Sequence, residues 1–140
     1  STPKGSLEEP FNPLEIMLAS GATFIARAFT GNPNNLKEIT KQAILHKGFS
    51  FVDVLQPCVA FYNTSEFYRQ RVYDLKKKGH NVSDRRSAVK KIKEWNYVNA
   101  ESGKIPIGVF YKIKKPTFEE NVLKKRKPYK LPIPNLKNFL

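Results

Sequence analysis

A strand–helix–strand pattern between residues 22 and 55 is the feature that most constrains the fold. Two short apolar runs, "ATFIARAF" and "FSFVDVL", flank the segment "TGNPNNLKEITKQAILHKG". We expect Asn32 to cap a helix there, with Pro33 at its first position and Gly48 at its end. Helical spacing predicts a buried stripe of Leu36, Ile39, Ala43 and Ile44. This order and spacing predict a βαβ unit with parallel strands and a right-handed crossover.

Further periodic segments extend this unit into an α/β domain. "NPLEIMLAS" predicts a helix before the first strand, and "SEFYRQRVYDL" predicts one after the second strand, with Ser65 as its cap. After a loop at "KKKGHN", "SDRRSAVKKIKEW" predicts a helix that is capped by Ser83 or Asp84 and faces inward through Ala88, Ile92 and Trp95. "IPIGVFYKI" predicts a third strand. We therefore expect residues 13–112 to form a mostly parallel sheet flanked by helices.

Positive charge is concentrated in the second half of the chain. Residues 1–75 hold seven Lys and Arg against seven Asp and Glu, so the formal net charge of +13 lies in residues 76–140. This asymmetry indicates an acidic partner, whether nucleic acid, an anionic membrane surface or an acidic protein. A solvated lysine-rich surface would give the same composition. "KKIKEWNY" and "KKRKPYK" mix basic and aromatic residues, so a nucleic-acid-binding module is the alternative hypothesis, although no motif of that class is present.

Length and cysteine content set the broad class of the protein. A chain of 140 residues fits one domain, and no run of about 18 uncharged apolar residues indicates a membrane span. The opening "STPKGSLEEP" lacks the layout of a signal peptide, and it starts with Ser1 rather than Met, as in a processed chain or part of a longer one. The single cysteine excludes an intrachain disulfide and indicates a reducing compartment, so we expect a cytoplasmic protein.

Catalytic motifs are absent from the sequence. There is no glycine-rich phosphate loop and no nucleophile elbow. His46 is expected to be a cation at a helix end, and His80 a loop residue. Asp53 lies within a strand and is expected to be a paired structural carboxylate. The residues by themselves therefore assemble no active site.

The lone thiol, Cys58, follows Pro57 just beyond the second predicted strand. One interpretation is a small buried hydrophobic residue. The other is a metal ligand at the carboxyl end of a strand, with the N–H groups of Val59 and the residues after it directed at the thiolate. Iron–sulfur clusters are normally held by four protein ligands, so the remaining ligands would have to come from outside this chain.

The stretch "GATFIARAFTGNPNNLKEITKQAILHKGFSFVDVLQPCVAFYN" resembles the C-terminal half of the β subunit of 2-oxoacid:ferredoxin oxidoreductases, the pyruvate and 2-oxoglutarate enzymes. The resemblance continues through "SEFYRQRVYDL", "DRRSAVKKIKEW" and "IPIGVFYKIKKPTFEE" and covers roughly residues 1–120. It implies the C-terminal part of a thiamine diphosphate-binding fold over residues 1–115. Prolines at 116, 128, 132 and 134 then predict an extended basic tail over residues 116–140.

The resemblance also implies a chemistry. The family decarboxylates a 2-oxoacid on thiamine diphosphate with Mg²⁺, forms an acyl-coenzyme A and passes electrons through a [4Fe-4S] cluster to ferredoxin. Cys58, within "LQPC", matches one of the four cluster ligands. The other three cysteines and the acidic Gly-Asp-Gly metal motif belong to the N-terminal half of the subunit and are absent here. The chain is thus expected to be inactive alone.

The same resemblance supplies expected partners. They are the N-terminal half of the β subunit, the α subunit of a heteromeric enzyme, and ferredoxin. Because ferredoxins are typically acidic, we expect the basic second half to help dock ferredoxin, unless the tail instead clamps a neighbouring subunit. The identity of the 2-oxoacid is not defined by this part of the family sequence.

Overall fold

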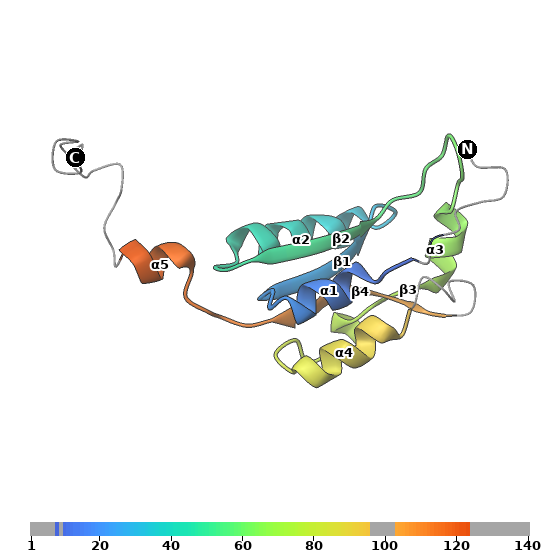
Figure 1. Ribbon diagram of the computed structural model, residues 1–140. Coiled ribbons are helices and arrows are strands. Elements are labelled where there is room, and N and C mark those ends of the chain that lie inside the picture. Colours follow the sequence, from blue (N-terminus) through green and yellow to red (C-terminus); the bar gives the residue numbers. More distant parts are fainter. Residues whose placement is uncertain (1–7, 9, 96–102, 124–140) are drawn as a thin grey trace, which may run out of the picture.

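A computed structural model describes residue 8 and residues 10–95 and 103–123 of the chain (Figure 1). A mixed four-stranded sheet with helices on both faces forms its centre. The elements in chain order are α1 (Pro13–Ala19), β1 (Phe24–Phe29), α2 (Pro33–Leu45), β2 (Ser50–Leu55), α3 (Ser65–Arg71), β3 (Val72–Asp74), the 3₁₀ turn η1 (Lys76–Lys78), α4 (Arg85–Lys93), β4 (Ile105–Lys112) and α5 (Phe118–Leu123).

The strand order is β2-β1-β4-β3. The predicted βαβ unit is confirmed, because β1 and β2 pair in parallel with Phe24 opposite Ser50 and Phe29 opposite Leu55. β4 pairs antiparallel with β1, and β3 pairs parallel with β4, so the sheet is mixed. The carboxyl ends of β1 and β2 therefore lie at the same end of the sheet as the amino ends of β3 and β4.

Both faces of the sheet are covered. On one face, Phe24, Ala26 and Ala28 of β1 pack against Ile39 of α2. On the opposite face, Ile25 and Phe110 form a cluster with apolar residues of α1 and α4. Every residue of β1 is buried, as a strand covered on both faces requires.

The predicted helix caps are largely confirmed. The Asn32 side chain accepts a hydrogen bond from the N–H of Asn35, with Pro33 following it. Asp84, rather than Ser83, caps α4 through the N–H groups of Arg86 and Ser87. Ala88, Ile92 and Trp95 are buried as expected.

Other predictions were wrong in detail. The expected helix over "SEFYRQRVYDL" ends at Arg71, because Val72–Asp74 pairs with Ile105–Ile107 of β4 and becomes β3. Thr64, not Ser65, precedes this helix. In the expected inner stripe of α2, Ile44 is 77% exposed and lies outside the core.

The tail also differs from the prediction. Its first part was expected to be extended, but Phe118–Leu123 forms the short helix α5. Thr117 and Glu120 exchange hydrogen bonds at its start, and Glu119 and Glu120 occupy its first turn, which favours a helix there. The rest of the predicted tail, residues 124–140, lies outside the described residues, as do residues 1–7 of the opening segment.

None of the helices in the described part of the chain has the length and apolar character that crossing a membrane requires.

Candidate functional site

Cys58 lies just beyond the carboxyl end of β2. The strand ends at Leu55, and Pro57 leads into a turn over residues 58–62. The Tyr62 N–H donates to the carbonyl oxygen of Cys58 over 3.0 Å, which closes this turn. In Figure 1 the segment runs out past the end of the sheet before the chain returns into α3. The thiol is therefore carried on a short closed loop at the end of a strand that is anchored in the sheet.

Backbone groups around the Cys58 side chain make its thiol more acidic. Backbone hydrogen bonds from Phe61, and then from Ala60 and Tyr62, lower the pKa of the thiol below its usual value. The side chain is exposed, so Cys58 is not packed in the core that the described residues form. N–H groups directed at the thiolate were predicted from the sequence. They come from Ala60, Phe61 and Tyr62, and not from Val59, the first residue of the predicted set.

Apolar side chains surround the thiol without being buried. Val59 is 78% exposed, Phe61 94% and Tyr62 78%. Large apolar residues rarely gather at one exposed loop unless another surface covers them. This apolar rim was not recognised in the sequence, where these residues have only the pattern of a loop after a strand. It indicates that the Cys58 loop is an interface.

The described residues supply too few ligands to hold a metal centre alone. No group of three or more His, Cys, Asp or Glu side chains lies within reach of a shared metal ion in the part of the chain that the structure describes. The sequence contains a single cysteine, so a [4Fe-4S] cluster could take one thiolate from this chain. An acidic cluster that would suit Mg²⁺ and a diphosphate is likewise missing from the described ranges.

Asp53 is a structural carboxylate, as predicted. Its Oδ2 accepts a hydrogen bond from Nε of Arg27 over 2.7 Å, and the Arg27 side chain is fully buried. The Arg27 guanidinium also lies 4.8 Å from the centroid of the Trp95 ring. This pair joins β1 to β2 beneath α4 and contributes to the scaffold, not to a reactive site.

Neither histidine forms part of a catalytic arrangement. Burial, and then the charge of Lys112, lower the pKa of His46, whose Nε2 lies 2.8 Å from the Thr23 hydroxyl. The expectation that His46 is a helix-end cation is therefore wrong, because its ring is held near a lysine and partly out of water. His80 Nε2 lies 2.8 Å from the carbonyl oxygen of Phe110 and Nδ1 lies 3.2 Å from the Ser87 hydroxyl.

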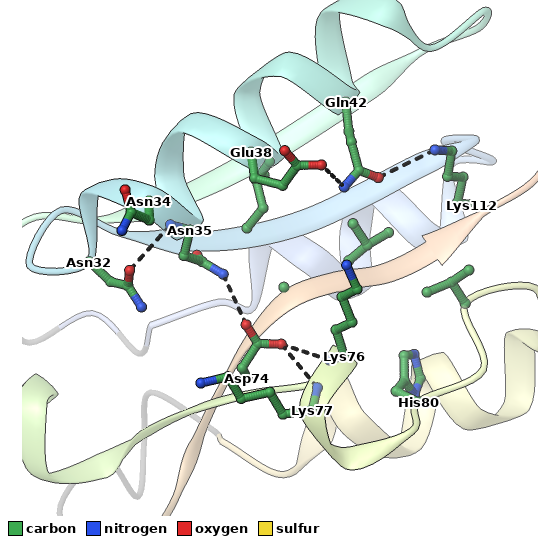
Figure 2. Close-up of a pocket in the computed structure, with 14 residues that line it drawn as sticks. Asn32, Asn34, Asn35, Glu38, Gln42, Asp74, Lys76, Lys77, His80 and Lys112 are labelled. Atoms are coloured by element: carbon green, nitrogen blue, oxygen red, sulfur yellow. Dashed lines mark hydrogen bonds between the residues drawn. The ribbon is translucent and has the colours of Figure 1, made fainter.

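A cavity of about 960 Å³ lies between α2 and η1, over β4 (Figure 2). Its polar groups largely bind one another. Asp74 accepts from the N–H groups of Lys76 and Lys77, at 2.7 and 3.3 Å, and lies 3.5 Å from the Asn35 amide. Gln42 links Lys112 to Glu38 through hydrogen bonds of 3.3 and 3.0 Å. These closed networks stabilise the contact between α2 and the second half of the chain and leave no arrangement suited to acid–base catalysis.

The structure weakens the nucleic-acid hypothesis. Trp95, the aromatic centre of "KKIKEWNY", is 2% exposed and packs against Arg27 and Tyr68. A buried indole cannot stack on a base. The second motif, "KKRKPYK", lies outside the described residues.

Comparison with known proteins finds β subunits of ferredoxin oxidoreductases. The family described as the C-terminal part of the pyruvate ferredoxin oxidoreductase beta subunit matches residues 58–127, so the matched region begins at Cys58. A β subunit of 2-oxoacid:ferredoxin oxidoreductase 1 from Aeropyrum pernix is 37% identical over 96% of this chain and 44% of its own length. One from Saccharolobus solfataricus is 36% identical over 91% of this chain and 44% of its own length.

A solved structure is also similar. It is the 2-oxoglutarate:ferredoxin oxidoreductase from Magnetococcus marinus with 2-oxoglutarate, coenzyme A and succinyl-CoA bound. The match has a TM-score of 0.79 and 35% identity, and it covers 99% of this chain and 46% of the other. The chain therefore spans about half the length of the relatives that it matches.

Proposed function

Since the chain belongs to the family formed by the C-terminal parts of pyruvate:ferredoxin oxidoreductase β subunits, we propose that it forms that part of a 2-oxoacid:ferredoxin oxidoreductase and supplies one iron ligand, Cys58. The observation that carries this proposal is the Cys58 loop. A lone, exposed thiol with a lowered pKa stands on a closed turn at a strand end, with apolar side chains around it.

The chemistry of this loop suits an iron ligand. Iron–sulfur clusters are bound by thiolates, and the three turn amides lower the pKa of the Cys58 thiol. Hydrogen bonds to ligand sulfurs and exclusion of water also tune the potential of a bound cluster. When bound, such a cluster would carry electrons one at a time. Cys58 would hold one iron, and Val59, Phe61 and Tyr62 would help to exclude water once a partner covers them.

The proposed reaction is that of the complete enzyme. It is the oxidative decarboxylation of a 2-oxoacid on thiamine diphosphate and Mg²⁺, with formation of an acyl-coenzyme A and transfer of electrons to ferredoxin. This chain would act as scaffold and ligand donor, since it offers no acidic cluster for the metal and diphosphate in its described ranges. Its proposed partners are the rest of the β subunit, an α subunit and ferredoxin. A reducing compartment such as the cytoplasm would keep Cys58 available.

The proposal is tested by Cys58→Ser in the assembled enzyme. A serine oxygen is a poorer ligand for a cluster iron than a thiolate. We expect loss of the [4Fe-4S] absorbance and electron paramagnetic resonance signal, with thiamine diphosphate affinity unchanged. Thr64→Ser, just before α3, is the matched control and should keep the cluster, because the Thr64 side chain makes no capping hydrogen bond. A normal cluster signal in the Cys58→Ser enzyme would show that Cys58 is not a ligand.

A further inference from the structure

Thr30, the residue that follows β1, donates two hydrogen bonds to one carbonyl group of β2. Its N–H donates to the Leu55 carbonyl oxygen over 3.1 Å, and its hydroxyl donates to the same oxygen over 3.3 Å. Leu55 is the last residue of β2 and lies three positions before Cys58. Thr30 therefore fixes the point at which the chain leaves the sheet to form the Cys58 loop.

Phe29, the last residue of β1, holds the other side of the same loop. Its ring is buried and lies 5.6 Å, from centroid to centroid, from the ring of Tyr68 in α3. This is the helix into which the Cys58 loop returns. Phe29, Leu55 and Trp95 belong to one apolar cluster, and Tyr68 packs against it. The chain segments that enter and leave the loop are therefore both attached to the carboxyl end of β1.

The turn after β1 fits closely around these contacts. A Cβ atom added at Gly31 would overlap the ring of Phe29, so glycine is needed where the backbone passes this ring. The Asn32 N–H donates to the Phe29 carbonyl oxygen over 2.9 Å and closes the turn. Phe29 and Thr30 are thus held in a fixed orientation toward Leu55 and Tyr68.

The Cys58 loop has little packing of its own. Val59, Phe61 and Tyr62 are all more than three-quarters exposed, at 78%, 94% and 78%. The hydrogen bond from the Tyr62 N–H to the Cys58 carbonyl oxygen fixes the shape of the turn, but not its position on the sheet. That position depends on the attachments of the loop at Leu55 and Tyr68.

We propose that Thr30 is a positioning residue for Cys58, which holds the Cys58 loop in place and so slows the loss of an iron–sulfur cluster bound through this thiolate. The inference rests on the proposed function, because it takes Cys58 to be an iron ligand. Thr30 would act through the backbone of Leu55 and would not itself bind iron. Residues that orient a metal ligand typically change metal affinity or activity by about 10- to 100-fold when they are replaced.

Thr23, at the opposite end of β1, provides a matched control. Its N–H and its hydroxyl donate to the Phe49 carbonyl oxygen over 3.2 and 3.1 Å, just before β2 begins. Thr23 is 5% exposed, and its hydroxyl also lies 2.8 Å from Nε2 of His46. Loss of the Thr23 hydroxyl should therefore weaken the scaffold at least as much as loss of the Thr30 hydroxyl, but at the end of the sheet away from Cys58.

The rate of cluster loss in the assembled enzyme tests the proposal. Thr30→Val removes the hydroxyl donor and keeps the β-branched shape and the backbone N–H. With an excess of the ferrous-iron chelator bathophenanthroline, we expect the [4Fe-4S] absorbance of this variant to decay at least about tenfold faster than that of the unchanged enzyme. Thr30→Ala should behave in the same way, so the test does not depend on how well valine fits. Thr30→Ser keeps a hydroxyl and should restore the slow decay, and Thr23→Val should leave the rate unchanged.

The midpoint potential of the cluster gives a second measurement that a purely structural role of Thr30 would not change. Hydrogen bonds to ligand sulfurs stabilise the more negative, reduced cluster, so displacement of the turn amides should lower its potential. A redox titration followed by electron paramagnetic resonance should show a lower midpoint potential in Thr30→Val and an unchanged one in Thr23→Val.

The outcomes separate this inference from the proposed function. If Thr30→Val and Thr23→Val lose the cluster at the same rate, Thr30 only stabilises the fold and the positioning role is overturned. Fast decay in Thr30→Ser would also overturn it, since that variant keeps the hydroxyl. A cluster that persists in Cys58→Ser would overturn the ligand assignment. A cluster that is lost in Cys58→Ser but is retained equally by the two valine variants would overturn the positioning role alone.

Discussion

At Cys58, a few backbone groups determine the state of a single side chain. The turn amides of Phe61, Ala60 and Tyr62 lower the pKa of the thiol by stabilising negative charge on the sulfur. A cysteine on a flexible exposed loop would have no such ordered donors, and its pKa would lie near the usual value of about 8.5.

The pH dependence of alkylation should show this effect. Because the pKa is lowered, thiolate is present at lower pH, so the rate of reaction of Cys58 with iodoacetamide should rise with a midpoint at lower pH than in the unfolded chain. Mass spectrometry of the chain at a series of pH values gives this midpoint. The same chain in denaturing urea is the control, since its turn is lost. Coincident midpoints in the two conditions would contradict ordered donors at Cys58.

A second residue-scale feature is the ion pair of Arg27 and Asp53. The Arg27 side chain is fully buried, and the Asp53 side chain is 17% exposed. Removing one partner of a buried pair leaves an uncompensated charge, whereas replacing both by apolar residues of similar volume is often neutral. The effect of the pair on the free energy of unfolding is therefore seen only when one partner is removed and the other remains.

We expect Asp53→Val to lower the free energy of unfolding by about 3 kcal/mol, because Arg27 would remain charged in the core without this carboxylate. The double variant Arg27→Met with Asp53→Val should recover most of that loss. Urea denaturation of the single and double variants measures the difference. If the single and the double variant have the same free energy of unfolding, the loss in Asp53→Val does not come from an unpaired Arg27.

At the scale of helices and strands, the structure shows which of the two predicted residues, Ser83 or Asp84, caps α4. Asp84 Oδ1 and Oδ2 accept from Arg86 N and Ser87 N at 3.0 and 3.1 Å. The Ser83 hydroxyl is instead 2.8 Å from the Asn81 side chain, outside the helix.

Asp84→Ala should therefore lower the free energy of unfolding by about 1 kcal/mol, the usual cost of losing a cap. Ser83→Ala is the matched control and should change it by no more than a few tenths of a kcal/mol. Thermal denaturation of both variants provides the measurement. A larger loss for Ser83→Ala than for Asp84→Ala would reverse the assignment of the cap.

The sequence predicted the elements whose causes are local, and failed where distant pairing decides. β1, α2 and β2 follow from an apolar run, a capped helix and a second apolar run, and they were predicted close to their observed bounds. β3 was missed because Val72–Asp74 becomes a strand by pairing with β4, more than 30 residues later. Residue order also gave no sign that β4 joins β1 in the antiparallel direction.

The candidate site divides in the same way. Cys58 and its amide donors could be predicted, since a cysteine after a strand and a proline sets a local turn. The cavity between α2 and η1 could not, because Asn35 and Asp74 meet only through tertiary packing.

On the scale of the whole molecule, the lysines of η1 extend away from the end of the sheet that carries the Cys58 loop. Cys58 follows the carboxyl end of β2, where Leu55 pairs with Phe29. The lysines of η1 extend past Asp74 towards the other end, where Lys112 pairs with Phe24 and its N–H donates to Val82 over 2.8 Å. Asp74 pairs with Ile107, so η1 leaves the sheet partway along β4 and not at its far end. An acidic protein docked on η1 would still be held several residues of strand length away from an iron at Cys58.

This separation sharpens the expectation that a basic surface docks ferredoxin. Charge on the exposed η1 turn, Lys76–Lys78, should contribute little to electron transfer, although it adds to the net charge of the chain. The alternative is that ferredoxin docks on the tail lysines Lys124, Lys125 and Lys127, which lie outside the described residues. Because each set holds three lysines, changing either set to glutamine removes the same charge.

In the assembled enzyme, we expect Lys124→Gln, Lys125→Gln and Lys127→Gln together to slow ferredoxin reduction at low salt. The effect should fade as salt rises, because attraction between exposed charges is screened over about 8 Å near physiological ionic strength. The matched change of Lys76, Lys77 and Lys78 to glutamine should leave ferredoxin reduction unchanged. Stopped-flow kinetics at several salt concentrations compare the two variants, and a small artificial electron acceptor should be reduced equally by both.

Loss of assembly and of both activities in the tail variant would instead mean that the tail clamps a neighbouring subunit. Slower ferredoxin reduction in the η1 variant alone would place the docking surface at the end of the sheet away from Cys58, and would count against Cys58 as the ligand of the cluster that reduces ferredoxin.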